Sequence, residues 1–509
     1  MKKCKASLRI LWNFLREERS RMCFYATAIF GLLAYLYLFV NHVNNNDMIS
    51  CLPYGYGSGI SSGRWMLQIL NLLADKLWGS YPVPVFNGLL SLIFLGLTGA
   101  VLVRVLEIRG KWQAFAVGAI TVTAAPIGSI FFFLFTTHFY MLALLSMAVA
   151  AWLLKKRSVW GFLLSVALAA CSLGIYQAYF PFFAVILLLE LLRCCLKEEK
   201  SCRDLLLRGV KYVAALAASY LLYYLVLQGF LLVFSKQLSD YQGLDTMGSI
   251  SLRALPLAYY HFFALFTHNY VGFNATLLLR IALLLLLAVS LCGLVCFWFR
   301  AKKKVAALLS TLIFLLLPLA ANAFLVLAPQ STIYTRMTMG LMSLFYLPLI
   351  LAPKKLHIRS VVCLLLLLCA TNYAWQSNGN YMWVAYSNEK AANYFTTMFT
   401  RIKSAEGYDE NMEVVFVGAQ IDDESFQDNW YGTPFLYGGR TGAIGQLNQY
   451  SRPSFVLTYL GYSYRDISPQ EQEDYETVIE EMECYPNDGS IVTVDGKVLV
   501  KLEDQENTP

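Results

Sequence analysis

The chain has 509 residues, of which 58% are hydrophobic and 14% are charged, whereas a soluble domain averages about 25% charged residues. Its apolar runs are too long for a globular core, which excludes an ordinary soluble enzyme and predicts a membrane protein. Residues 376–509 hold 8 Lys/Arg and 22 Asp/Glu, whereas residues 1–375 are strongly basic. The positive charges lie between apolar runs, where they set topology, so we expect no nucleic-acid partner.

The chain begins with a basic segment, residues 1–21, followed by an apolar run without a small-residue cleavage site. We interpret this run as a signal anchor with a cytoplasmic N-terminus. Hydropathy predicts a polytopic α-helical domain over residues 22–375 with about eleven transmembrane helices. They are expected near 22–40, 83–106, 112–128, 137–154, 159–175, 179–193, 211–234, 277–299, 304–327, 336–352 and 359–375.

The loops between these spans alternate in charge. Those near 107–111, 155–157, 193–211, 300–304 and 354–359 are all basic, and the loops between them are poor in Lys and Arg. This is the positive-inside pattern, and it predicts a multi-pass protein of the bacterial cytoplasmic membrane. An odd number of spans then places residues 376–509 outside the cytoplasm.

Two of the outer loops are long, 41–82 and 235–276. The second contains Tyr259–Phe263, which we interpret as an interfacial helix or a re-entrant hairpin within 256–272. The sequence of the acidic tail, 376–509, predicts a small α/β domain. Strands are expected at 413–418 and 455–460, an acidic helix at 470–483, and a hairpin at 491–500 with an Asp-Gly turn.

Acidic residues that could do chemistry on the outer side are few. Asp47 follows Asn46 a few residues past the first span, at the level where a lipid-linked headgroup would lie, and it is a candidate general base. The alternative is that Asn44–Asp47 forms a turn and a helix cap. Asp75 is the second candidate base.

Two arginines on the outer side are candidate phosphate ligands. Arg64 lies near the expected N-terminus of a helix, where a guanidinium and free N–H groups attract an anion. Trp65 beside it either stacks on a sugar or anchors the chain at the membrane interface. Arg336, after Tyr334, runs against the charge bias of the outer side, which indicates either phosphate binding or snorkelling to lipid headgroups.

Tyr176 and Gln177 fall at an outer helix–helix turn, where they line a polar cavity or form a tight polar turn. His138 also maps to the outer side. No carboxylate stands at metal-ligand spacing from it, so the sequence predicts no metal site and no cofactor.

Together the Asn/Asp-rich first outer loop, Gly63-Arg64, the Tyr176-Gln177 turn and the Tyr334/Arg336 segment resemble the Gtr type II membrane glucosyltransferases of the GT-C superfamily. The resemblance covers residues 20–375. It implies transfer of a sugar, glucose by family, from a polyprenyl-phosphate donor to an envelope glycan or wall polymer on the outer face.

The resemblance also implies roles for individual residues. Asp47 matches the catalytic acid of the first outer loop, although such loops commonly carry two adjacent acids and this one has Asn46-Asp47. Arg336 matches the late arginine that holds the lipid phosphate, and we assign Arg64 to the same task. The expected substrate-binding residues are Asn46, Trp65, His138, Tyr176, Gln177 and Tyr334.

Two other functions fit a multispan envelope protein. A lipid-linked glycan flippase or transporter predicts ionisable residues in mid-span and internal repeats, and neither is clear in this sequence. An O-antigen-type polymerase usually places its longest loop late between spans and lacks a folded tail. A scaffold that binds a partner through its acidic tail is the non-enzymatic alternative.

Overall fold

A computed structural model of the protein describes residues 16–41, 43–51, 59–79, 83–156, 158–239, 252–268, 270–328, 333–353, 355–418 and 450–503. These residues are mostly helical and form two compact units. The first unit contains the described residues of 16–40 and 59–379. The second contains those of 41–51, 380–418 and 450–503.

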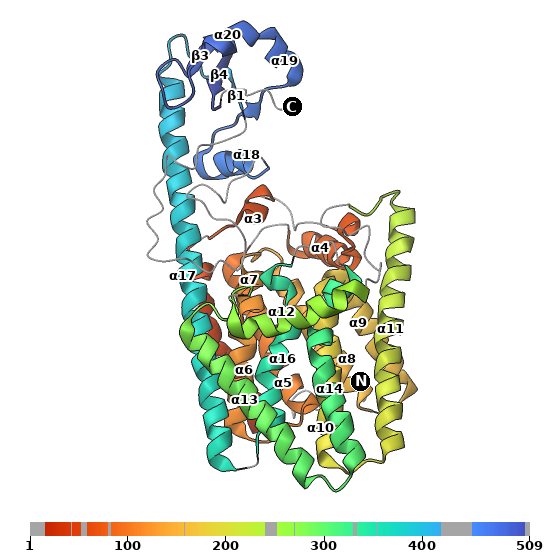
Figure 1. Cartoon of the computed structure of the whole chain (residues 1–509). Helices are drawn as coiled ribbons and strands as arrows, with labels where there is room; N and C mark the ends of the chain where they lie inside the picture. The colour runs from red at the N-terminus through yellow and green to blue at the C-terminus, as the bar shows by residue number, and fades with distance from the viewer. Residues whose placement is uncertain are drawn as a thin grey trace. The chain divides into compact units, whose positions relative to one another are not determined.

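The first unit is a bundle of apolar helices (Figure 1). Eight described helices are long and apolar enough to cross a membrane, and the pair α6–α7, bent by 45°, makes a ninth. Each predicted span coincides with an apolar helix, but α9 and the segment Met339–Leu351 are shorter, so the number eleven stays a prediction. The helices are α2 (Glu18–Val40), α5 (Pro84–Val105), α6 (Lys111–Thr123), α7 (Ala125–Phe131), α8 (Thr137–Leu154), α9 (Val159–Ile175), α10 (Phe180–Lys197), α11 (Cys202–Val233), α13 (Leu277–Arg300), α14 (Lys304–Ala321), α15 (Ala323–Leu327), α16 (Ser343–Leu351) and α17 (Leu356–Lys403).

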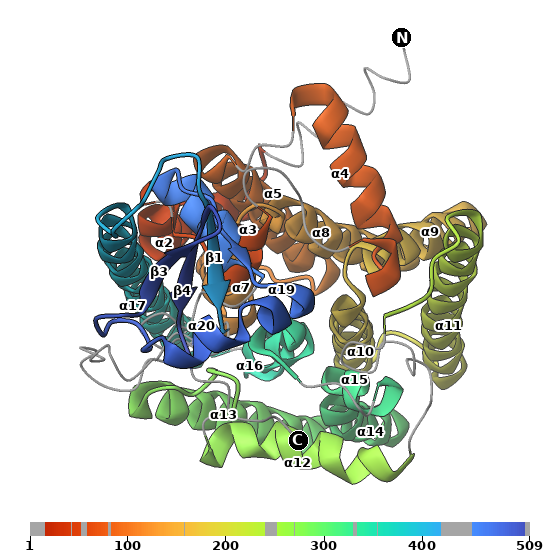
Figure 2. The ribbon, with the colours of Figure 1, turned by 90° about the horizontal axis from the view of Figure 1, so that it is seen from above.

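Two helices of the first unit lie across the bundle axis, α4 (Trp65–Trp78) and α12 (Leu255–Thr267), as the two views show (Figures 1 and 2). Both leave large apolar side chains exposed, Leu73 and Leu77 on α4 and Tyr260 and Phe263 on α12. Such helices are typical of the membrane surface. The described part of the second long loop therefore contains one short helix, α12, in place of a hairpin.

Charged side chains gather at one end of the first unit, around Glu107. This carboxylate pairs with Lys155 at 3.2 Å, Arg193 at 2.9 Å and Lys197 at 2.5 Å. Glu107 adopts a positive φ of 50° directly after α5. Three helices, α5, α8 and α10, are thus joined by ion pairs that are partly shielded from water.

A second carboxylate of this cluster, Glu190, has no exposed surface. It pairs with Arg193 at 2.9 Å and Arg208 at 3.5 Å, and it accepts a hydrogen bond of 2.5 Å from the Tyr212 hydroxyl. A buried carboxylate is tolerated only when it is paired and hydrogen-bonded in this way. The contacts tie α10 to α11.

Lysines at the same end cap the C-termini of helices. Lys155 donates to the carbonyl oxygens of Arg104 and Val105 at the end of α5. Lys211, on α11, donates to those of Leu154 and Lys156 at the end of α8. The last carbonyls of a helix have no partner within the helix, and a cation there also offsets the helix dipole.

The second unit is built on a four-stranded sheet of order β2-β1-β4-β3. Its strands are β1 (Glu413–Val417), β2 (Arg465–Asp466), β3 (Ile491–Val494) and β4 (Lys497–Lys501). β1 is parallel to both β2 and β4, and β3 pairs with β4 antiparallel. The predicted hairpin is confirmed, because Asp495 and Gly496 both take the positive φ that a two-residue turn requires.

The predicted strand at 455–460 is wrong. The segment forms a short helix, α18 (Arg452–Phe455), which continues as a π-helical turn over Val456–Leu460 and ends at Gly461 with φ 72°. Phe455 and Tyr459 stack with their ring centres 4.5 Å apart. Residues four apart meet in this way on a helix, whereas an extended strand holds them too far apart to touch. The predicted acidic helix at 470–483 is two short helices, α19 (Pro469–Asp474) and α20 (Glu476–Glu481).

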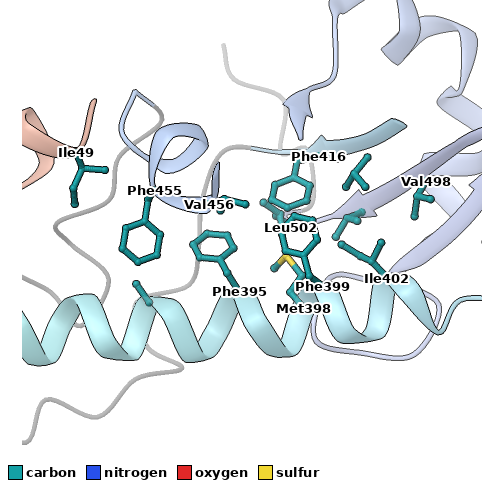
Figure 3. Close-up of a cluster of buried hydrophobic side chains, with 13 residues drawn as sticks. Ile49, Phe395, Met398, Phe399, Ile402, Phe416, Phe455, Val456, Val498 and Leu502 are labelled. Atoms are coloured by element: carbon teal, nitrogen blue, oxygen red, sulfur yellow. The ribbon is translucent and has the colours of Figure 1, made fainter. Parts of the chain in front are cut away.

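Helix α17 extends far beyond the expected end at residue 375 and supplies the core of the second unit. Its residues Ala391, Phe395, Met398, Phe399 and Ile402 are buried against the sheet and α18 (Figure 3). Their spacing of three and four residues is that of an amphipathic helix. The tail therefore begins on a helix that has already formed the last apolar span.

Candidate functional site

Three short segments of the first unit bring polar side chains together around Tyr176. They are Ile60–Ser62 with Gly63 and Arg64, Gln177–Tyr179 between α9 and α10, and Thr335–Met337 before α16. Each is a single 3-10 turn, so its side chains project from a loop that the helices hold in place.

The loop before α4 places Arg64. Gly63 ends the first turn with φ 71°, and a side chain there would collide with Gln177 and Tyr223. Gln177 Nε2 donates to the Ser62 carbonyl at 2.8 Å and to the Tyr223 hydroxyl at 3.1 Å, which in turn donates to the Gly63 carbonyl at 3.1 Å. Gln177 therefore fixes the loop that carries Arg64.

Arg64 reaches the aromatic pair Tyr140 and Tyr176. Its Nη1 donates to the Tyr140 hydroxyl at 3.2 Å, and its Cζ lies 5.5 Å from the centre of the Tyr176 ring. The two tyrosine rings stack at 5.0 Å. The hydrogen bond to Tyr140 and the cation–π contact with Tyr176 thus help to hold the guanidinium at the N-terminus of α4.

Arg336 approaches Tyr176 from another segment. Its guanidinium lies 4.4 Å from the ring centre of Tyr334 and 4.9 Å from that of Phe133, and its charge acts on the Tyr176 hydroxyl. Within the described part of the chain, Arg336 forms no ion pair. Two cations from segments far apart in the sequence therefore flank one phenol, an arrangement suited to an anion.

Several buried polar atoms near these arginines have no hydrogen-bond partner among the described residues: Trp65 Nε1, Thr136 Oγ1, His138 Nδ1 and Tyr179 Oη. Tyr179 meets Tyr176 edge-on at 5.3 Å, and Thr136 and His138 follow Phe133 in the chain. Buried polar groups are nearly always satisfied in a native protein. These atoms are therefore candidates for contacts with a polar ligand.

Trp65 is buried, with its indole stacked on Phe230 at 5.8 Å and packed against Gly174. A buried ring in this position packs beneath the loop that carries Arg64. It is not an exposed anchor at the membrane interface. Tyr140 and Phe133 complete the surroundings of the arginines and were not among the predicted residues. Their only signal in the sequence was their place in an aromatic-rich outer turn.

Asp47 and Asn46 belong to the second unit, in helix α3 (Asn46–Ser50). Asn45 caps this helix by accepting a hydrogen bond of 2.9 Å from the Met48 amide, and the Asp47 side chain is exposed in the first turn. The helix-cap interpretation of the Asn run is therefore correct for Asn45, and it leaves the Asp47 carboxylate accessible. Asp75 is exposed near the end of α4.

No group of three or more His, Cys, Asp or Glu residues in the described ranges is arranged to hold a metal ion. Residues 36–352, more than half of the chain, match the family described as Glucosyl transferase GtrII. The chain belongs to the GtrII glucosyltransferase family. The resemblance noted in the sequence is thereby confirmed. Comparison with curated proteins gave no significant match.

The GtrII match includes Asp47, Arg64, Tyr176 and Arg336 and ends just before α17. Membership indicates a membrane-embedded glycosyltransferase, which acts on a sugar donor and a glycan acceptor. Most of the second unit, including its sheet, lies outside the matched residues.

Proposed function

We propose that this GtrII protein transfers a sugar, glucose by family, from a polyprenyl-phosphate donor to an envelope glycan or wall polymer on the outer face of the bacterial cytoplasmic membrane. The observation that carries the proposal is the pair of arginines, Arg64 and Arg336, around Tyr176. The anionic part of such a donor is a phosphodiester, which becomes a phosphate monoester when the sugar leaves, and two guanidiniums bind it with directed hydrogen bonds.

The same arginines stabilise the leaving group. As the bond from the sugar C1 to the phosphate oxygen breaks, its electron pair stays on the phosphate, and the guanidiniums neutralise the growing charge. The Tyr176 hydroxyl, next to Arg336, donates a further hydrogen bond to the phosphate. Because the side chains supply the positive charge, we propose no metal for this step.

Asp47 is the proposed general base. The acceptor hydroxyl oxygen attacks C1, the new C–O bond forms as the bond to phosphate breaks, and the hydroxyl proton passes to the Asp47 carboxylate. One base is sufficient for a single displacement, which inverts the anomeric configuration, as in inverting glycosidases. His138 and Tyr179 offer buried polar atoms to the sugar hydroxyls, and Asn46 and Tyr334 remain proposed substrate contacts.

The test is the composition of envelope glycans in a deletion strain that expresses wild type, Arg64→Ala, Arg336→Ala or Asp47→Asn. Each variant is expected to lose the sugar substituent that wild type restores, because removal of a charge-stabilising group typically lowers the rate by about 10²–10³-fold and removal of a general base by about 10²–10⁴-fold. Leu73→Ala, on the exposed face of α4, is the matched control and should behave as wild type. An unchanged envelope in the deletion strain, with normal growth, would argue for a different activity.

A further inference from the structure

The second unit contains one piece of the GtrII-matched sequence, the described residues of 41–51, although its sheet and its helices from α18 onward lie outside the match. This piece carries Asp47 in α3. The unit that lies mostly outside the matched residues therefore contains the segment with the proposed base.

The apolar part of this attachment is Ile49. Its side chain is fully buried in the core formed by α17 and the sheet, in the same cluster as Phe395, Phe455 and Val456 (Figure 3). Burying an isoleucine in this way is more favourable than leaving its side chain in water. Ile49 is two residues from Asp47, so the helical turn between them moves with the core.

The polar part of the attachment is Asn44. Its Nδ2 donates to the Tyr459 hydroxyl at 2.6 Å, and its carbonyl accepts a hydrogen bond of 3.0 Å from Asn388 Nδ2 on α17. Asn44 and Asn388 are both buried, and the Tyr459 ring is fixed by stacking on Phe455 at 4.5 Å. Hydrogen bonds between buried groups are costly to break, so they set the start of α3.

The result is a segment with buried residues on both sides of an exposed carboxylate. Asn44, Asn45, Met48 and Ile49 are buried, whereas Asp47 is exposed in the first turn of α3. A carboxylate at the N-terminus of a helix is favoured by the free amides there. Both anchors therefore restrict the backbone of Asp47 while its side chain stays accessible.

We propose that the C-terminal unit positions the base, with Asn44, Asn388 and Tyr459 as positioning residues that act through Asp47. The inference rests on the proposed role of Asp47 in sugar transfer. It gives the tail, which the GtrII match does not cover, a part in the reaction: the tail keeps the carboxylate in one orientation so that each encounter with an acceptor hydroxyl is productive.

The experiment measures transfer from polyprenyl-phosphate [¹⁴C]glucose into the endogenous acceptor of membranes that contain the full-length protein. Tyr459→Phe and Asn388→Ala each remove one hydrogen bond, and we expect each to lower the maximal rate about 3–30-fold with little change in the donor concentration at half-maximal rate. Tyr462→Phe is the matched control, because Tyr462 stacks on Phe399 at 4.5 Å in the same unit and no hydrogen bond among the described residues uses its hydroxyl.

Two further readouts separate positioning from general destabilisation. Hydrogen exchange of residues 43–51 should increase in Tyr459→Phe, while exchange in β1 and β4 stays at the wild-type rate. In the Asp47→Asn background, Tyr459→Phe should have no additional effect, since two changes that act through one group are not additive.

The outcomes are distinguishable. Wild-type rates in Tyr459→Phe and Asn388→Ala, with Asp47→Asn inactive, would overturn the positioning inference and leave the base intact. An equal loss from Tyr459→Phe with and without Asp47 would also overturn it, because the residue would then act on the fold alone. A fully active Asp47→Asn would instead remove the proposed base, on which the inference rests.

Discussion

Tyr176 connects two arginines that are 272 positions apart in the sequence. The sequence predicted Arg64, Arg336 and Tyr176 one by one, from a helix start, a misplaced positive charge and a polar turn. It did not predict that they meet, because that depends on how α4, α9 and the segment before α16 pack. Tyr140 was missed for the same reason, since a tyrosine at the start of an apolar helix looks like any interfacial aromatic residue.

A prediction at the residue scale concerns Glu190. Glu190→Ala takes the buried carboxylate away from Arg208 and leaves Arg193 paired with Glu107, and loss of one partner from a buried pair costs about 3–5 kcal/mol. The free energy of unfolding of the purified protein in mixed detergent–SDS micelles should fall by that amount. Glu199→Ala, an exposed carboxylate in the following loop, is the control and should change it by less than about 0.5 kcal/mol. Equal effects for the two variants would contradict the ion-pair account.

At the scale of elements, long apolar helices were predicted well because twenty apolar residues in a row admit few other structures. The end of α17 was not predicted, because the helix continues to Lys403 beyond the expected end at residue 375. Polar residues after 375 mark the end of a span, but they do not end a helix, and no proline follows before Lys403. The spacing of Ala391, Phe395 and Phe399 was the available signal. The strand predicted at 455–460 failed because a short apolar run fits either structure.

The second unit offers a prediction about pH. Hydrogen bonds from Arg465, then Lys497 and Ser468, hold the pKa of Glu471 well below its usual range. A carboxyl whose pKa is depressed in the folded state stabilises the fold above its unfolded pKa, about 4.3, and this contribution is lost as the pH falls toward the folded pKa. Hydrogen exchange in β1 and β4, corrected for intrinsic rates, should therefore increase below about pH 4.

The variant Glu471→Gln tests the cause. It should increase exchange in β4 at neutral pH and flatten the acid dependence, because the group that titrates has been removed. Glu476→Gln, for which no ion pair is found among the described residues, is the control and should keep the wild-type profile. An unchanged acid dependence in Glu471→Gln would mean that other carboxyls govern the unfolding.

At the scale of the whole molecule, the division into two units differs from the one drawn along the sequence. The sequence divides at residue 375, where hydropathy changes, whereas the second unit includes residues 43–51 as well. Ile49 lies in an outer loop by hydropathy, and its burial depends on a partner more than 300 residues away, which no local pattern contains. Long-range association of this kind is what a single sequence predicts least.

Topology remains a prediction that a reporter experiment can check. If the N-terminus is cytoplasmic and the spans are odd in number, alkaline phosphatase fused after Glu503 should be active and green fluorescent protein at the same position should be dark. Fusions placed after Glu199 should give the reverse result. Fluorescence at both positions would contradict an odd number of spans.

The lysines that cap helix ends bear on the order of assembly. The last carbonyls of α8 are capped by Lys211, which lies more than fifty residues later on α11. Because the chain is synthesised from the N-terminus onward, α8 is made before α11. The end of α8 therefore lacks this cap until α11 has been made and has docked beside it.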